Sequence, residues 1–396
     1  MRLSKFSVVP ALWPALVTYC LVVLPSSGLA YAQEPQQNVQ QDTQQQDEGD
    51  AGGLIVPVVQ SVPKIFLPDI GIAGDASYER NFVSPNDPRY STLPNQPKLR
   101  DGQFVANSLI DPFADAQLSI DLPNGSSANI EEAWLFFNKL PGGFGLTLGK
   151  FKPRFGLLDE LDTFQLPMYN RPRAIANYIG DGLNDTGAQV DYVVPTLNLK
   201  AFLTVGRGDM LGASQSDSTI PVVYMGTLAY AQDLFENGSL EFGASAAEGP
   251  SPYGDYQVLV DPYLQIQLAP SQRHIWTWSA EGMFAQRNNS AYASSRRGFY
   301  TFLDYNFALI YHVGFLADWV QAPGPLATSG TFPNAYPGAP TDGSNWDFAP
   351  NFTWFVSGNT RLRVQYTHTT PNGPELADDA VAFQATFSMG NLKQLQ

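Results

Sequence analysis

Charged residues are scarce in this sequence, and basic residues are the scarcer kind. Only 15% of the 396 residues are charged, well below the roughly 25% of ordinary soluble domains. Lys and Arg number 22 against 37 Asp and Glu, so the net charge is −15. This balance leaves no broad basic surface that could displace counterions from nucleic acid. We therefore expect no nucleic-acid partner.

Cysteine is nearly absent, and Cys20 is the single one. It lies within residues 1–32, where Arg2 and Lys5 precede an apolar core that ends in Ala30-Tyr-Ala32. This pattern predicts a cleavable secretory signal peptide. Without residues 1–32, 20 basic residues face 37 acidic ones, a net charge of −17, and no cysteine is left. Export without cysteine excludes a disulfide framework and a thiolate metal site.

Long apolar runs are missing after residue 32, so no transmembrane helix is expected. An uncleaved N-terminal anchor is the alternative to the signal peptide, and Pro10 and Pro14 within the apolar core argue against it. An exported chain of this kind is either soluble outside the cytoplasm or a closed β-barrel in an outer membrane. Within lipid, only helices and closed barrels satisfy every backbone polar group.

The remaining chain divides by composition. Residues 33–53 are Gln-rich and acidic, which predicts a disordered arm; a coiled-coil arm is the alternative, but no apolar heptad is visible. Residues 54–68 form a Pro-containing lead-in segment. From residue 69 to 391, alternating runs end at Gly, Pro, Asn or Asp, as strands do. Residues 392–396 form a C-terminal tail.

Each strand-like run has an apolar face with terminal aromatic residues and a polar face. Val381, Phe383 and Phe387 share one face near the C-terminus, whereas Gln384 and Thr386 share the other. The polar faces carry few Lys and Glu, unlike the solvent face of a soluble sandwich. About sixteen such runs are present. The fold class predicted is all-β, an antiparallel transmembrane β-barrel of about 16 strands (16–18) with an aqueous lumen, in preference to a sandwich or solenoid.

The connections between the predicted strands alternate in length. Short turns, among them Pro123–Gly125 and Leu140–Gly143, are expected on the periplasmic side. Long connections, among them 81–102, 155–185 and 322–344, are expected to face outward. A loop of about thirty residues without a strand is usually functional or disordered, so loop 155–185 is the predicted constriction of the lumen.

One part of the chain resembles a known family. The run Ile130-Glu-Glu-Ala-Trp-Leu-Phe-Phe137, followed by Leu146-Thr-Leu-Gly-Lys-Phe-Lys-Pro-Arg-Phe-Gly156, is similar to a segment of Gram-negative outer-membrane porins of the phosphate-selective porin O/P group. Asn177–Gln189 and Phe383–Gly390 continue the likeness. The resemblance implies a 16-stranded barrel, usually trimeric, that passes small hydrophilic or anionic solutes.

The chain departs from that group in two ways. Its phosphate-selective members line their constriction with Arg and Lys, whereas this chain has only 20 basic residues after residue 32. Outer-membrane barrels typically end in an aromatic residue, whereas Asn391–Gln396 follows the last predicted strand here. A dedicated phosphate channel is therefore not expected, although the barrel and the outer membrane are.

Charged residues on the polar faces and in loop 155–185 are the candidate pore-lining or constriction residues. The set is Lys150, Lys152, Arg154, Arg171, Arg173, Lys200, Arg361, Arg363, Asp115, Glu132, Asp191 and Asp261. Lys150, Lys152 and Arg154 share one strand face by the period of two; anchoring at the lipid headgroups is their alternative role. For Arg171 and Arg173 the alternative is an exposed loop position. The sign of any ion preference stays open.

Enzymatic motifs are missing. His274, His312 and His368 lie far apart, and no zinc, nucleophile-elbow or dinucleotide-binding pattern is present. We therefore expect no enzyme, no cofactor and no metal. The sequence predicts an outer-membrane porin for passive diffusion of small hydrophilic solutes or ions, in contact with outer-membrane lipid and assembled as a homotrimer. The alternative is a structural or adhesive barrel without an open pore, whose loops 81–102 and 322–344 bind a surface partner.

Overall fold

The structure is a computed structural model that describes residues 68–82, 95–122, 127–138, 140–180, 182–208, 222–250, 256–287, 295–321, 344–372 and 378–390. The predicted signal peptide 1–32, arm 33–53, most of the lead-in segment and tail 392–396 lie outside these ranges. No helix in the described part of the chain has the length and apolar character needed to cross a bilayer.

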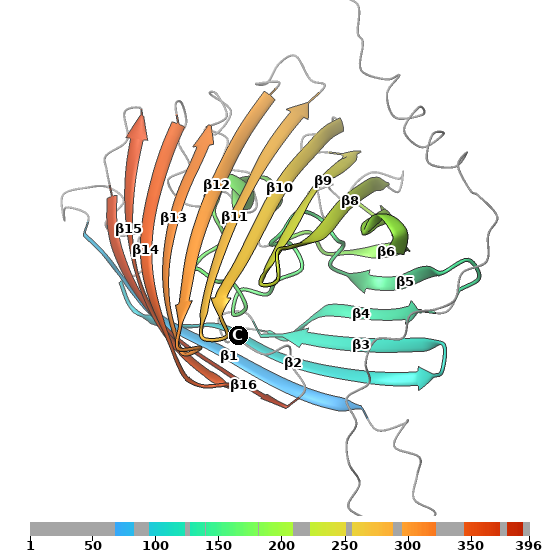
Figure 1. Cartoon of the computed structure of the whole chain (residues 1–396), viewed down its shortest axis with the longest axis horizontal. Coiled ribbons are helices and arrows are strands. Elements are labelled where there is room, and N and C mark those ends of the chain that lie inside the picture. The colour runs from blue at the N-terminus through green and yellow to red at the C-terminus, as the bar shows by residue number, and fades with distance from the viewer. Residues whose placement is uncertain are drawn as a thin grey trace, which may run out of the picture. The chain divides into compact units, whose positions relative to one another are not determined.

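The described chain consists almost entirely of β-strands (Figure 1). The strands are β1 (Asp69–Asn81), β2 (Pro97–Asp111), β3 (Ala114–Asp121), β4 (Asn129–Phe137), β5 (Phe144–Phe151), β6 (Asp185–Val194), β7 (Leu199–Gly206), β8 (Val223–Leu234), β9 (Gly238–Pro250), β10 (Tyr256–Ser271), β11 (His274–Arg287), β12 (Ser295–Phe307), β13 (Tyr311–Gln321), β14 (Ser344–Ser357), β15 (Thr360–Asn372) and β16 (Asp378–Gly390). Helix α2 (Arg173–Ile179) lies between β5 and β6, and a short 3-10 turn (Pro195–Leu197) joins β6 to β7.

These strands form one closed antiparallel barrel. Each strand pairs with its sequence neighbours, and β1 pairs with β16 from Gly71–Gly390 to Asn81–Ala380 to close the sheet. Because closure leaves no sheet edge, every strand has a hydrogen-bonding partner on both sides. The prediction of a barrel of about sixteen antiparallel strands is confirmed.

Alternation along each strand gives the barrel an apolar outside and a polar inside. On β11, Trp276 and Trp278 are each 40% exposed, whereas Ser279 and Glu281 are 8% and 3% exposed. Aromatic rings stack along the outside near the short turns, with Trp276 and Tyr305 at 4.1 Å between ring centroids. An outside of this composition is suited to lipid, with aromatic side chains at its rim.

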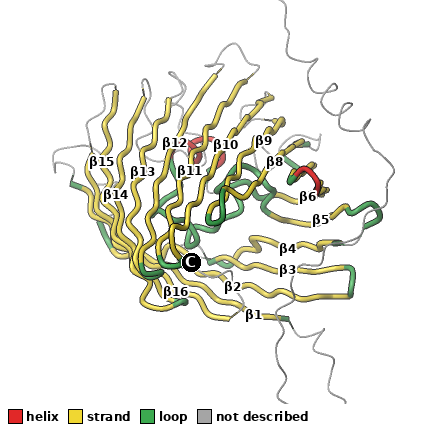
Figure 2. Tube along the Cα trace, in the orientation of Figure 1, coloured by secondary structure: helices red, strands yellow, loops and turns green. Residues whose placement is uncertain are grey.

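The short turns that the structure describes join neighbouring strands at one end of the barrel (Figure 2). One prediction about the ends is wrong. The strand order places the β3–β4 connection, which contains Pro123–Gly125, at the end with the long connections, because the Pro112-Phe113 turn already joins β2 to β3 at the opposite end. Residues 123–126 themselves lie outside the described part of the chain.

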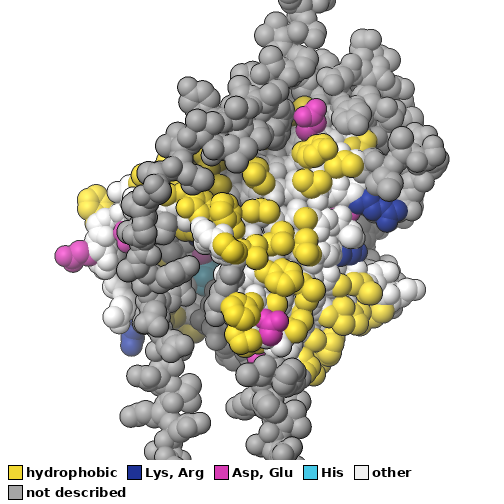
Figure 3. All heavy atoms as spheres, turned by 90° about the vertical axis from the view of Figure 1, so that its right-hand side faces the viewer, with side chains coloured by type: hydrophobic (Ala, Val, Ile, Leu, Met, Phe, Trp, Pro, Cys, Tyr) yellow, Lys and Arg dark blue, Asp and Glu magenta, His cyan; other side chains and the backbone are white. Residues whose placement is uncertain are grey.

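The barrel wall is lower on one side. Strands β3 to β7 have 8–10 residues, whereas the others have 11–16. Figure 3 looks onto the side of the barrel on the right of Figure 1 and shows hydrophobic side chains gathered there with few charges among them. A transmembrane strand needs about 9–11 residues, so the low side barely reaches the thickness of a bilayer core.

Candidate functional site

The β5–β6 loop, residues 152–184, folds into the barrel interior. Strand β5 ends at Phe151, because Pro153 has no N–H to donate to the ladder. Apolar loop residues then form one buried cluster with inward side chains of the wall; the loop contributes Phe155, Leu158, Leu166, Met168, Ala174, Ile175, Ile179 and Leu183. The loop therefore contributes its own hydrophobic core inside the lumen.

Two inward arginines of β15 hold the middle of the loop. Arg363 donates to the carbonyl oxygens of Met168 at 2.6 Å and Leu166 at 2.9 Å, and Arg361 donates to those of Phe164 and Leu166. The two arginines are only 5% and 2% exposed. Both guanidinium groups are covered by the loop and donate to its backbone, and Arg363 also donates to the wall side chains of Thr353 and Gln384.

The same loop segment reaches the β1–β2 wall. Tyr169 donates from its hydroxyl to Ser77 at 3.0 Å, and its backbone N–H donates to Gln365 at 2.9 Å. The guanidinium of Arg100 lies 4.2 Å from the centroid of the Tyr169 ring and pairs with Asp75 at 3.3 Å. The loop thus spans from its root at β5 to the seam where the barrel closes.

Helix α2 returns the chain along β11 to β13. The Asp318 carboxylate accepts the backbone N–H groups of Arg173 at 2.5 Å and Ala174 at 3.0 Å, and the Arg173 side chain pairs with Asp347 at 3.0 Å. A β-carbon on Gly298 would lie 2.9 Å from Cα of Ala174. Glycine is therefore required where the helix meets the wall.

The root of the loop is held by ion pairs. Arg154 pairs with Glu160 at 2.5 Å and with Glu241 at 3.0 Å. Lys152 pairs with Glu131 at 2.6 Å and also with Asp162. These contacts tie the loop to β4 and β9, so it meets the wall on several sides of the lumen.

A β-bulge turns two successive carboxylates inward. The register shifts between Ser119 and Ile120, so that Glu132 faces Ser119 while Ile130 faces Ile120. The extra residue is Glu131, whose carboxylate accepts from Gln103 at 2.6 Å. Strict alternation assigns only one of the two to the lumen, and a bulge places both there.

Acidic side chains also lie beneath the loop. Burial raises the pKa of the Asp159 carboxyl to about 7, although Arg171 and the N–H of Leu183, 2.6 Å away, favour its charged form. Asp261 is fully buried beside Glu281, and neither oxygen of Asp261 has a hydrogen-bond donor. Glu281 in turn accepts from the N–H of Leu157 at 2.9 Å.

The prediction that Lys150 lines the lumen is wrong. Its side chain shares the outer face of β5 with the exposed Leu148 and donates to the carbonyl of Ile130 at 2.7 Å. Lys152 and Arg154 do not share that face, because the chain has left the strand and turned inward. Arg171 donates to the carbonyls of Leu158 and Leu161, so it braces the loop from within.

The other predicted residues lie on the inner face of the barrel. The structure brings Lys152 and Glu132 together, since the N–H of Lys152 donates to Glu132 at 3.1 Å. The alternation along their strands also places the following residues on the inner face: Asp115, Asp191, Lys200, Asp261, Arg361 and Arg363. Lys200 is exposed and lies near the end of the barrel with the short turns. Their role in lining a path for solutes stays a prediction.

Acidic residues predominate on the inner wall. Among described side chains of inward register that are not fully exposed, fifteen are acidic: Asp75, Glu79, Asp101, Asp115, Asp121, Glu131, Glu132, Asp185, Asp191, Glu241, Asp261, Glu281, Asp304, Asp318 and Asp347. Five are basic: Lys98, Arg100, Arg296, Arg361 and Arg363. The loop adds Asp159, Glu160 and Asp162 against Lys152, Arg154, Arg171 and Arg173.

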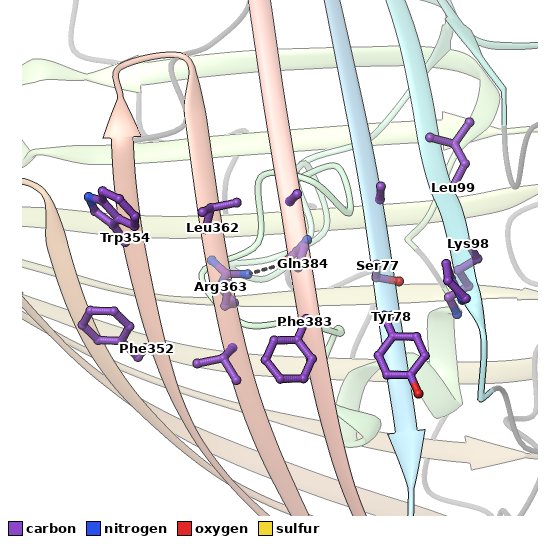
Figure 4. A pocket seen from close by; sticks show the side chains of 14 residues that line it. Ser77, Tyr78, Lys98, Leu99, Phe352, Trp354, Leu362, Arg363, Phe383 and Gln384 are labelled. Carbon is purple, nitrogen blue, oxygen red and sulfur yellow. Dashed lines mark hydrogen bonds between the residues drawn. The ribbon is translucent and has the colours of Figure 1, made fainter.

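Two hollows differ in character. A cavity of about 220 Å³ lies inside the barrel against the loop, with Asp304, His312 and Arg363 among its lining residues. A groove of about 720 Å³ crosses the outside of β14, β15, β16, β1 and β2, where Phe352, Trp354 and Phe383 line it (Figure 4). The inner cavity has the polar groups expected of a solute path, and the outer groove does not.

The described residues include no group of three His, Cys, Asp or Glu side chains arranged to hold a metal ion. His312 contacts Asp304 at 2.8 Å and His368 contacts Asp379 at 2.7 Å, each as a single pair. The adhesive alternative assigns a partner to loops 81–102 and 322–344, of which residues 83–94 and 322–343 lie outside the described ranges.

The sequence of this chain is similar to that of a distant relative. No family model matches the chain. A protein of Aquifex aeolicus, described as uncharacterized, is 26% identical over 216 residues, which cover 47% of this chain and 46% of that protein. The match thus spans less than half the length of the relative.

Solved structures of similar shape are outer-membrane channels. The anion-selective porin of Comamonas acidovorans has a TM-score of 0.55 at 10% identity and covers 81% of this chain and 98% of that one. DcaP, an outer membrane channel of Acinetobacter baumannii, has 0.52 at 13%, covering 81% and 96%. OmpF of Salmonella typhi has 0.54 at 12%, covering 81% and 97%. The chain therefore shares its barrel fold with these proteins, which include an outer-membrane channel and a porin.

Proposed function

We propose that this protein is an outer-membrane porin that lets small hydrophilic solutes or ions diffuse passively through its barrel. The observation that carries the proposal is a closed barrel, apolar outside and polar inside, with a 33-residue loop docked in its lumen. Sixteen strands enclose a lumen too wide for wall side chains alone to fill. The loop narrows that lumen and sets the size of solute that passes.

The docked loop favours a narrow channel over a wide one. It contacts β4 and β9 through ion pairs, β15 and β1 through Arg363 and Tyr169, and β13 through Asp318. Only the space beside the loop is left for water. Single-channel conductance is therefore expected to be below that of the same barrel with the loop shortened.

The test is conductance in planar bilayers with purified protein. Stepwise current increases are expected on addition of the folded protein, and none with a heat-denatured sample at the same detergent concentration. A folded barrel is also expected to migrate faster on gels before boiling than after. Folded protein that inserts but gives no current steps would refute the pore and leave the structural barrel as the explanation.

We also propose a homotrimer in the outer membrane of a Gram-negative cell. Support comes from the low wall of β3 to β7, whose 8–10-residue strands barely span a bilayer core, and from the described trimer form of OmpT of Vibrio cholerae, a similar barrel with a TM-score of 0.52. Analytical ultracentrifugation in detergent tests this, and a monomeric mass that persists at high protein concentration would contradict it.

A further inference from the structure

The inner surface of the barrel carries a large excess of negative charge. The wall and loop together hold eighteen acidic and nine basic side chains among the described inward residues that are not fully exposed, an excess of nine.

Five of the basic side chains that face the lumen are already engaged by carboxylates or by the loop. Lys152, Arg154 and Arg173 each pair with carboxylates. Arg361 and Arg363 instead donate to loop carbonyls and lie beneath the loop, 2% and 5% exposed. Neither group presents a bare cation to the water path, so the interior offers anions few binding positions.

Several buried carboxylates, by contrast, lack a donor. Asp261 is fully buried and neither of its oxygens has a hydrogen-bond donor. One oxygen of Asp159 and one of Asp347 are also buried without a donor, at 1% and 6% residue exposure. A buried carboxyl oxygen without a donor is stabilised either by a proton or by a nearby cation. Asp159 and Asp347 already lie beside Arg171 and Arg173, so the charge excess of the whole inner surface, and not any single carboxyl group, favours cations in the lumen.

We propose that the channel prefers small cations to anions, an inference that rests on the proposed porin function. Charge of one sign on a low-dielectric wall focuses the field in the lumen and concentrates counter-ions there. A lumen potential of about one kT per unit charge raises the cation concentration and lowers the anion concentration, each by about threefold. Together these changes give a cation-to-anion permeability ratio of about seven. Screening by salt weakens the effect, so the preference is largest below about 0.1 M.

The inward carboxylates of Asp121 and Asp191 are the residues to change. Both are half-buried on the inner face, and Asp191 lies against Gly145 of the neighbouring strand. The double variant Asp121→Lys/Asp191→Lys lowers the excess from nine to five. If the potential scales with that excess, the cation-to-anion ratio falls from about seven to about threefold. Glu248→Lys is the matched control, since Glu248 alternates with the buried Ala247 and lies on the outer face.

The experiment measures the reversal potential of single channels across a KCl gradient. The expected result is a cation-selective potential that falls in the double variant and not in the control. If the lysine variant does not fold, Asp121→Asn/Asp191→Asn is used and a smaller shift in the same direction is expected. Anion selectivity, or an equal shift in the control, would overturn the cation preference while current steps still support the porin. Absence of current would instead refute the porin itself.

Discussion

Arg363→Met tests whether the β15 arginines hold the loop in the lumen. The substitution keeps an unbranched apolar stem and removes both hydrogen bonds to the loop, at 2.6 Å to Met168 and 2.9 Å to Leu166. A hydrogen bond from a charged donor contributes about 1.5–3 kcal/mol, so the docked loop loses about 3–6 kcal/mol. Since 1.4 kcal/mol is tenfold in an equilibrium, the undocked population rises by more than about a hundredfold.

The assay is single-channel recording of Arg363→Met beside wild type. We expect a higher mean conductance and more current noise, because the segment around Leu166 leaves the wall more often. Arg273→Met is the control, since Arg273 lies exposed in the β10–β11 turn. Cation preference should not decrease, because a positive charge is removed. Unchanged conductance and noise in the folded variant would refute the anchoring role.

Two further predictions concern the same loop. In Gly298→Val, the added β-carbon would lie only 2.9 Å from Cα of Ala174, so we expect α2 to be displaced and the conductance to rise. Gly358→Val is the control, because the space around Gly358 is open. Acidification is expected to stabilise the loop in its docked position. Burial raises the pKa of the Asp159 carboxyl from 3.8 to about 7, so the contribution of the protonated carboxyl to loop stability is greatest below about pH 4 and is lost as the pH rises through 7. Current noise should increase between pH 5 and 8 in wild type, and a variant Asp159→Asn with the same increase would contradict this assignment.

The strands of the barrel follow directly from the sequence. Alternation along β11 and β16 identifies the two faces because an apolar side chain on the polar face would lose burial in lipid. The departures occur where alternation is locally interrupted. Pro153 ends β5 at Phe151. Strand β2 begins at Pro97, where a bulge opposite Asp75 lets a charged, Gly-containing stretch pair with β1.

The constriction is less predictable because its contacts are distant in sequence. Arg363 bonds to Met168 across 195 positions, and no local pattern shows that an inward arginine will meet a backbone carbonyl and not a solute. Parity also fails at a bulge, which is why Glu131 was not among the predicted residues although it pairs with Lys152. The adjacent pair Glu131-Glu132 is the sequence feature that could have predicted the bulge. In a regular strand one of two neighbouring carboxylates would face lipid, and a bulge avoids this by turning both inward.

The seam between β1 and β16 has a consequence for assembly. Asp75 accepts hydrogen bonds from Gln384 and Thr386, 309 and 311 positions away, and Tyr169 of the loop bonds to Ser77 on the same strand. Contacts of such sequence separation form late, because the entropy of closing the intervening chain must be overcome first. Closure of the cylinder therefore awaits export of the final strand, and the lumen segment must enter before or together with that closure. Misinsertion of the loop would consequently appear as a kinetic defect in barrel biogenesis.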